Sequence, residues 1–528
     1  MKAIACLKRF LGCAVAVCLV ASVTACSSGA KQSVSAGGNA SPGAKQNGGV
    51  LRYSTQLGPK TLYLPKSSTT NDKTFTQPTL EQLGRPDSSG IMQPWLAESF
   101  KDDADNLTLT IQLRPDIHFT DGSPCDADAV KWNIDQYVKN GQASALDNPK
   151  SVNAVDSQTV QVKFDAFAND WDTVIGNLQI CSKQAYEKNG QDWCATHMVG
   201  TGPFLLDSFA QDSKMVFKKN PDYRIKGEPY LDRIEVDIIP DSNTQVSAFK
   251  NNEVDTISTT DTTIISTIDG AGFKSISQKA PDLATIGYFM FDTKDKSQPL
   301  SNLQVRQAIL HGIDFKNVAK SLTKGLGTYS NQFGVPGAFS YNKDAKLYEY
   351  NVKQAKEMLA SAGYPNGFET KIFVSNNPGY APMAVALQAS LKEIGIKADI
   401  VTEDASLISQ QQVNDSLPGF IVNQGASQMD LTLNYIRLYS SKGIKNHGMF
   451  DYPKDYEDAL FGARAAKTLD VKKTLLQKAS KMLTQDDCMV VPLCVMYIHT
   501  YTQKNVHDTG INQINQNIWT PETAWVGK

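Results

Sequence analysis

The stretch WLAESFKDDADNLTLTIQLRPDIHFTDGSPCDADAVKWNID, residues 95–135, contains a strand, a turn and the start of a helix in succession. Its first half alternates apolar with polar residues, which predicts a strand buried on one face. The apolar positions are Leu107, Leu109, Ile111 and Leu113. Residues 114–122 then turn the chain, and a helix is expected to follow with Asp126 or Asp128 as its N-cap.

Strand and helix patterns keep alternating outside this stretch. Beyond residue 283 the strands ATIGYFMFDT (284–293) and FETKIFVS (368–375) are separated by helical patterns. Such a series predicts a second parallel or mixed sheet, and therefore an α/β protein. A chain of 528 residues is expected to divide into two or three lobes.

The composition is that of a soluble protein with no excess of positive charge. Apolar residues make up 41% and charged residues 20%, with 52 basic and 54 acidic side chains. Residues 1–25 carry three of the basic side chains and no acid, so the remainder is more acidic. A nucleic-acid partner is disfavoured, because phosphate binding requires a basic excess.

The N-terminus has the pattern of an export signal. Lys2, Lys8 and Arg9 precede an apolar run over residues 10–23, which is too short to span a membrane comfortably. The run ends in VTAC, which resembles a lipobox and predicts that residues 1–25 are removed and Cys26 is diacylated. The alternative is a plain signal peptide with an incidental cysteine.

A flexible tether is expected behind this cysteine. Residues 26–47 are rich in Ser, Gly, Ala, Lys, Gln and Asn and contain no aromatic side chain, so they cannot bury enough surface to fold. The predicted location is the outer face of the cytoplasmic membrane, with the body held close to it by the lipid anchor.

Five cysteines would remain in the mature chain besides the acylated Cys26: Cys125, Cys181, Cys194, Cys488 and Cys494. The odd count leaves at least one thiol free. Cys181 and Cys194 would close a short loop, so a disulfide between them is possible in an exported protein. An extended run would hold Cys488 and Cys494 about 20 Å apart, too far for a disulfide. No Cys or His cluster has the spacing of a zinc site.

Several motifs, in order along the chain, carry a resemblance to a known family. They are the stretch at 95–135, VGTGPF at 199, KNPDYRIKGEPYLDRI at 219, AFKNNEVD at 248, LSNLQVRQAILHGID at 300 and YNVKQAKEMLASAGYPNGFE at 350. The chain resembles solute-binding protein family 5, the extracytoplasmic receptors of peptide and nickel ABC importers, over roughly residues 48–505. The motif residues themselves are expected to be structural: Gly202 and Pro203 fit a tight turn, and Arg306 could brace a neighbouring loop.

The resemblance implies a two-lobed periplasmic-binding-protein fold of type II, similar to cluster C, with an extra α/β subdomain in lobe I. Lobe I would comprise residues 48–72, 200–282 and 498–528, the extra subdomain 73–199, and lobe II 283–497. The strand ATIGYFMFDT and the segment VMYIHTYTQ would be the two hinge crossings, and hinge closure would enclose the ligand.

The resemblance also locates the ligand site in residues 419–441. Peptide-binding members place a carboxylate there that pairs with the α-amino group of the ligand, and the matching position in this sequence is Gly425. A buried ammonium needs an opposing charge. Either Asp430 supplies it from a shifted position, or the ligand is not a peptide with a free N-terminus.

Other residues are candidates for neutral contacts with the ligand. Asn423 and Gln424 offer amide groups suited to a peptide backbone or a sugar, although such residues after a strand are most often in turns. Trp171 and Trp519 are candidates for stacking on a ring, although tryptophan is more often a packing residue. Nickel is disfavoured, because the loop has no histidine and His447 nearby is isolated. No metal and no cofactor is expected.

The sequence therefore predicts a binding protein, not an enzyme. It would deliver a solute, most favourably an oligopeptide, to the permease and ATPase subunits of an ABC importer; an oligosaccharide or another neutral polar solute is the alternative. An exported hydrolase is disfavoured because GxSxG, HExxH and P-loop patterns are missing. A receptor used in sensing or adhesion stays open.

Overall fold

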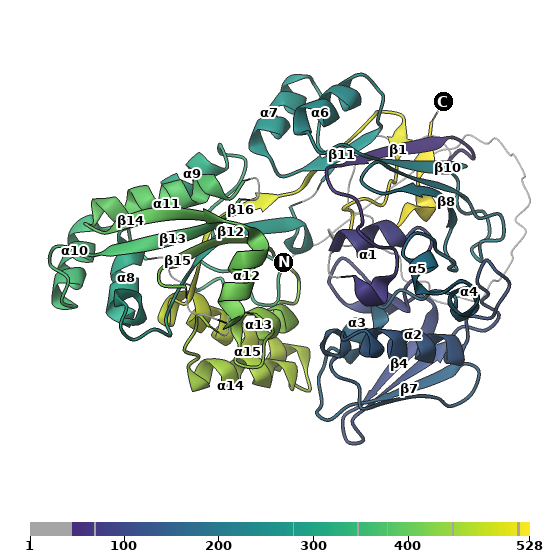
Figure 1. Cartoon of the computed structure of the whole chain (residues 1–528), viewed down its shortest axis with the longest axis horizontal. Coiled ribbons are helices and arrows are strands. Elements are labelled where there is room, and N and C mark those ends of the chain that lie inside the picture. The colour runs from purple at the N-terminus through teal and green to yellow at the C-terminus, as the bar shows by residue number, and fades with distance from the viewer. Residues whose placement is uncertain are drawn as a thin grey trace, which may run out of the picture. The chain divides into compact units, whose positions relative to one another are not determined.

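The computed structural model describes residues 45–527 except 68–69, 278, 346–347, 377–378, 415–416, 446–447 and 515–517. The predicted signal peptide, Cys26 and His447 lie outside the described residues. Residues 44–528 form one compact unit. Its helices and strands are labelled in Figure 1.

The stretch at 95–135 forms two strands and a helix as predicted. An antiparallel four-stranded sheet has the order β4 (Ala97–Asp103), β5 (Thr108–Leu113), β7 (Thr159–Lys163) and β6 (Ser151–Ala154). The apolar residues of β5 face the core, while Leu107 precedes the strand with a left-handed φ of 54°. Helix α2 (Ala127–Lys139) starts after Asp126, whose carboxylate accepts a hydrogen bond from the Ala129 N–H at 3.0 Å. The predicted N-cap is confirmed.

A six-stranded mixed sheet combines strands from the early and the late parts of the described chain. Its order is β17 (His499–Thr502), β11 (Thr256–Thr259), β1 (Val50–Thr55), β10 (Arg233–Ile238), β9 (Lys214–Lys219) and β8 (Phe204–Ala210). Strand β1 pairs in parallel with β10 and β11, and α6 (Ser242–Lys250) connects these two strands. Helix α7 (Thr262–Gly270) follows β11, and the hairpin of β18 (Val506–His507) and β19 (Trp525–Val526) ends the chain.

The second large sheet has five strands, in the order β14 (Lys397–Glu403), β13 (Glu369–Ser375), β15 (Phe420–Ala426), β12 (Ala284–Phe291) and β16 (Val490–Tyr497). Strands β13, β14 and β15 are parallel, and β12 pairs antiparallel with β15 and β16. The predicted second mixed sheet is confirmed.

Helices cover both faces of this sheet. Phe289 and Phe291 share one core with α8 (Leu303–His311), α9 (Phe315–Leu322), α10 (Val352–Ser361) and α11 (Ala381–Glu393). Tyr288 and Met290, which point to the opposite face, share a core with α12 (Ala405–Asn414), α13 (Thr432–Tyr439), α14 (Lys454–Arg464) and α15 (Leu469–Lys481).

Two crossing segments connect the six-stranded and five-stranded sheets, and they lie side by side. The first leads from α7 to β12, and the second is the step from β16 to β17. The Ile276 N–H donates to the Thr500 carbonyl at 2.8 Å, and the Ile498 N–H donates to the Leu283 carbonyl at 3.0 Å. The second crossing falls in the predicted segment VMYIHTYTQ, whereas the first lies at residues 271–283, directly before the predicted strand ATIGYFMFDT, which is itself part of the five-stranded sheet. The exact lobe boundaries stay a prediction.

The VGTGPF motif packs closely on the chain after α1 (Thr70–Thr76). A Cβ at Gly200 would lie 2.0 Å from the Thr79 carbonyl oxygen, and one at Gly202 would lie 2.6 Å from that of Pro78. Only glycine fits at this approach. The motif is therefore structural, as predicted.

The glutamate Glu81 joins three of the family motifs. Its side chain is fully buried and accepts hydrogen bonds from Trp95 Nε1 at 2.6 Å, Thr201 Oγ1 at 2.8 Å and the Tyr223 hydroxyl at 2.9 Å. Arg224 Nη2 completes the set at 3.1 Å. These five residues form the Glu81 cluster, in which every charge-bearing oxygen is hydrogen-bonded.

Arg306 has the bracing role expected of it. Its guanidinium donates to the Asp487 carbonyl at 2.8 and 3.1 Å, and to the Leu300 and Ser301 carbonyls at 2.9 Å. It thereby fixes the loop before β16 to the turn before α8.

Replacing Arg224 by alanine is expected to lower the free energy of unfolding by about 2 kcal/mol, because the buried Glu81 carboxylate loses its only cation within the cluster. Urea denaturation followed by circular dichroism measures this change. Lys226→Ala, at an exposed position two residues away, should leave the midpoint unchanged. Equal midpoints for Arg224→Ala and the wild type would contradict the role assigned to the cluster.

Candidate ligand-binding site

The predicted site residues Asn423, Gln424 and Gly425 are the last part of strand β15, not a turn after it. They pair with Tyr288, Gly287 and Ile286 of β12 and are partly exposed. Gln424 Nε2 donates to the Gly379 carbonyl at 3.3 Å, and Asn423 Oδ1 accepts the Gln424 N–H at 2.8 Å. Their amides are thus partly engaged within the protein.

Gly425 lies against an aromatic ring. A Cβ at this position would be 3.3 Å from Cε1 of Tyr288, which is tight but within reach of a small adjustment. Because Gly425 has no side chain, the ring edge of Tyr288 lies directly beside the backbone of β15 at this position. No carboxylate occupies this position, so an acid must come from elsewhere if the ligand carries an ammonium group.

Asp430 is committed to the protein itself. Its Oδ2 lies 2.5 Å from Nζ of Lys472 on α15, and its Oδ1 accepts the Thr432 N–H at 2.9 Å at the start of α13. The Lys472 side chain is only 8% exposed, so its ammonium depends on this carboxylate. The geometry therefore gives Asp430 a structural ion pair.

Asp282 is a second acid beside the same loop, which sequence reasoning did not single out. Its Oδ1 accepts the Met429 N–H at 2.7 Å, and burial raises its pKa. Among the described residues it has no ion-pair partner. The signal in the sequence was its position directly before the hinge strand β12.

Trp171 and Trp519 are fully buried in two different cores. Trp171 stacks on Phe164 with ring centroids 4.5 Å apart, and its Nε1 donates to Asp147 at 3.1 Å. Trp519 Nε1 donates to the Thr509 carbonyl at 3.1 Å. Trp171 and Trp519 therefore have the geometry of packing residues, which was the stated alternative to stacking on a ligand. Contact of either ring with a ligand stays a prediction.

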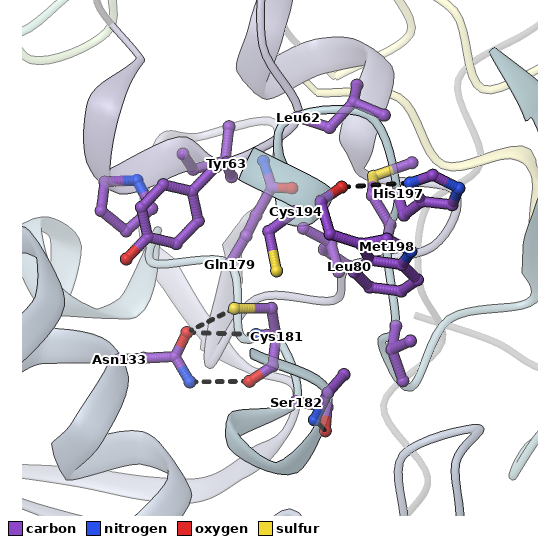
Figure 2. A pocket seen from close by; sticks show the side chains of 15 residues that line it. Leu62, Tyr63, Leu80, Asn133, Gln179, Cys181, Ser182, Cys194, His197 and Met198 are labelled. Carbon is purple, nitrogen blue, oxygen red and sulfur yellow. Dashed lines mark hydrogen bonds between the residues drawn. The ribbon is translucent and has the colours of Figure 1, made fainter. Parts of the chain in front are cut away.

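Cys181 and Cys194 line one cavity, but the possible disulfide is not formed, because both are free thiols. Figure 2 shows Cys181, before α4 (Lys183–Asn189), and Cys194, on α5 (Gln191–Cys194), with both sulfur atoms directed into it. Cys181 Sγ donates to Asn133 Oδ1 at 3.2 Å. Burial raises the pKa of Cys181 to about 12 and that of Cys194 to about 11, so both thiols stay protonated and oxidise slowly at neutral pH.

Arg464, at the end of α14, contacts the segment 73–199. Its guanidinium lies 2.8 Å from Asp147 Oδ1 and 3.0 Å from Asp170 Oδ1. The neighbouring Asn169 donates from Nδ2 to the carbonyls of Ala463 and Ala466, both at 2.9 Å. We call the contacts of Arg464 and Asn169 across these segments the Arg464 contact. Trp171 helps to position it, because Asp147 accepts one hydrogen bond from Trp171 and another from Arg464.

Among the described residues, no group of three or more His, Cys, Asp and Glu side chains is arranged to hold a metal ion. Within the same ranges, none of the helices combines the length and apolar character needed to cross a membrane.

Comparison with known proteins identifies the class. Residues 92–446, well over half of the chain, match the family described as bacterial extracellular solute-binding proteins, family 5 Middle. The chain belongs to this family, whose members are the extracytoplasmic substrate-binding subunits of ABC importers.

Particular relatives differ in the ligands they are named for. The chain is 28% identical over 434 residues to the glutathione-binding protein GsiB of Escherichia coli O1:K1, covering 78% of this chain and 82% of the relative. It is 25% identical over 440 residues to the heme-binding protein A of Haemophilus influenzae, with 76% and 78% covered. The structure of DppA from Helicobacter pylori in complex with the peptide STSA aligns with a TM-score of 0.75 at 23% identity, over 92% of this chain and 99% of that one. The two-lobed fold is thereby established.

Replacing Asp430 by asparagine is expected to lower the free energy of unfolding by about 2 to 3 kcal/mol, because it leaves the buried Lys472 ammonium without a counter-charge. Combining it with Lys472→Met should recover most of the loss. Urea denaturation of the two single variants and the double variant measures the coupling. A stable Asp430→Asn protein would instead show that the carboxylate is free to serve a ligand.

Proposed function

We propose that this chain is the lipid-anchored receptor of an ABC importer that captures an oligopeptide between its two lobes. Family membership is the observation that carries the proposal. Two similar proteins are named or described for peptides, the tripeptide glutathione and STSA. Peptides are therefore the first class of ligand to test.

The anchor is supported by the sequence. The VTAC motif, followed by the Ser- and Gly-rich residues 26–47, is the arrangement expected for a body tethered through Cys26. Such a tether of about 22 residues has a root-mean-square reach of about 25 Å, which keeps the receptor near its permease.

Hinge closure is supported by two features. The two crossing segments are short and hydrogen-bonded to each other, so they define one axis about which the lobes can move. The Arg464 contact joins α14 to the segment 73–199, which the proposed boundaries assign to opposite lobes. It is the type of polar contact that a closed form makes and an open form breaks.

A peptide needs a carboxylate for its α-amino group. Asp430 is neutralised by Lys472, and position 425 is glycine. We assign this role to Asp282, which lies beside the loop at Met429 and has no cation partner among the described residues. A bound ammonium would lower the Asp282 pKa, which burial now raises.

An oligosaccharide or another neutral polar solute is the second candidate. The observation in its favour is the pair of amides at Asn423 and Gln424, beside a glycine where peptide-binding members have an acid. Such a ligand would need no charge at Asp282.

Native mass spectrometry of the purified chain, followed by calorimetric titration with tripeptides, tests the proposal. The expected result is a retained or added peptide mass, and binding that Asp282→Asn weakens at least tenfold for free N-termini but not for N-acetylated peptides. Glu393→Gln, an exposed acid on α11, is the matched control. A sugar mass, or a library in which no peptide binds, would contradict the peptide assignment.

Replacing Arg464 by alanine is expected to favour the open form, because Asp147 and Asp170 lose their shared cation. Small-angle scattering should then show a larger radius of gyration. The affinity for a tripeptide that binds the wild type in the calorimetric titration should fall about tenfold. Lys467→Ala, exposed three residues further on, should leave both quantities unchanged. A closed Arg464→Ala protein with full affinity would show that the contact does not control closure.

A further inference from the structure

A β-hairpin of the proposed extra subdomain reaches the loop that follows β15. It consists of β2 (Gly84–Pro86) and β3 (Met92–Pro94), and we call its turn, residues 87–91, the hairpin tip. Gly90 in this tip packs against the side chain of Met429, because a Cβ built at Gly90 would lie 2.6 Å from both Cβ and Cγ of Met429. The proposed boundaries assign the two residues to opposite lobes, so they form a second contact between the lobes.

The hairpin is fixed to its own side of the protein. Arg85 in β2 donates from Nη1 to Glu522 Oε1 at 2.5 Å, and both side chains are buried. The Arg85 guanidinium also lies over the ring of Trp95, 3.9 Å from its centroid, and Trp95 donates to Glu81. The Glu81 cluster therefore holds the base of the hairpin, whatever the tip contacts.

The hairpin tip is shaped by Asp87. Its Oδ1 accepts the Ser89 N–H at 2.8 Å and the Ile91 N–H at 3.2 Å, and its carbonyl accepts the Gly90 N–H at 2.9 Å. Gly90 has a left-handed φ of 74°, which glycine adopts without strain. The tip thus presents bare backbone to Met429.

Met429 is fixed on the other side of the contact. Its N–H donates to Asp282 Oδ1 at 2.7 Å, its carbonyl accepts the Phe339 N–H at 2.7 Å, and its side chain is buried. Leu433, four residues further on, packs against the core that includes α2 and α3 (Trp171–Gly176). The loop that carries Met429 therefore meets the extra subdomain at two points.

We propose that Gly90 is a positioning residue for ligand binding. The hairpin tip seats on Met429 when the lobes close, and Met429 in turn holds Asp282 where the ammonium group of a peptide binds. Both partners are shaped before they meet, so the contact costs little ordering. The proposal rests on the proposed function for the ligand class, and it deepens it by linking lobe closure to the Asp282 carboxylate.

Gly90→Ala tests the contact without any ligand. The added methyl group has no room beside Met429, so the lobes should stay open and small-angle scattering should show a larger radius of gyration than for the wild type. Gly141→Ala is the matched control, because Gly141 has a similar φ of 79° and a Cβ there would have no neighbouring atom within 4 Å. Its radius of gyration should equal that of the wild type.

Two double variants separate the collision from backbone strain. In Gly90→Ala/Met429→Gly the nearest remaining atom of residue 429 is Cα, at 4.0 Å, so the radius of gyration should return to the wild-type value. In Gly90→Ala/Met429→Ala a Cβ remains at 2.6 Å, so the protein should stay open. The same radius of gyration in the two double variants, or an unchanged one in Gly90→Ala, would overturn the proposal.

Calorimetric titration with tripeptides tests the link to Asp282. Gly90→Ala should bind a tripeptide with a free N-terminus about tenfold more weakly than the wild type does. Its preference over the N-acetylated form should shrink as well, because Asp282 moves with the Met429 N–H, whereas a variant that only weakened the fold would lower both affinities by the same factor. An unchanged preference would overturn the positioning role. If the scattering results are as expected while no peptide binds, the closing contact stands, and the peptide assignment falls together with the role of Asp282.

Discussion

The buried carboxylate of Glu81 is the constraint on which the arrangement of residues 81–224 depends. A charge without solvent contact is tolerated only when it is fully hydrogen-bonded, and its donors come from three separate parts of the chain. Trp95 comes from the hairpin before β4, Thr201 from the glycine motif before β8, and Tyr223 with Arg224 from the turn after β9. The cluster therefore fixes the four-stranded sheet that contains β4 to the six-stranded sheet that contains β8 and β9.

The residues of the candidate site are positioned by contacts of longer range. Helix α13 turns Leu433 toward the core of the segment 73–199, and α14 ends in Arg464, which reaches Asp147 and Asp170. The five-stranded sheet supplies Asn423 and Gln424 at the end of β15. The polar contacts at Arg464 are satisfied within the protein.

The sequence predicted the architecture well, because its evidence was local. Alternation marked β5, Asp126 marked the start of α2, and the motif glycines marked a turn whose backbone packs on Pro78 and Thr79. The candidate site was harder. The ion pair between Asp430 and Lys472 could not be predicted from the sequence. The two residues are far apart in the chain, and only the folded structure brings α15 to the start of α13. The free thiols of Cys181 and Cys194 likewise depend on tertiary burial.

The charges that remain unpaired after folding are therefore more informative about the ligand than the family motifs. Motif residues such as Thr201 and Arg224 serve the fold, because both donate hydrogen bonds to the buried Glu81 carboxylate. They are therefore not free to bind a ligand. Asp282 belongs to no motif, and no cation forms an ion pair with it among the described residues. A ligand with an ammonium group would supply the counter-charge that Asp282 lacks, and a peptide with a free N-terminus carries such a group.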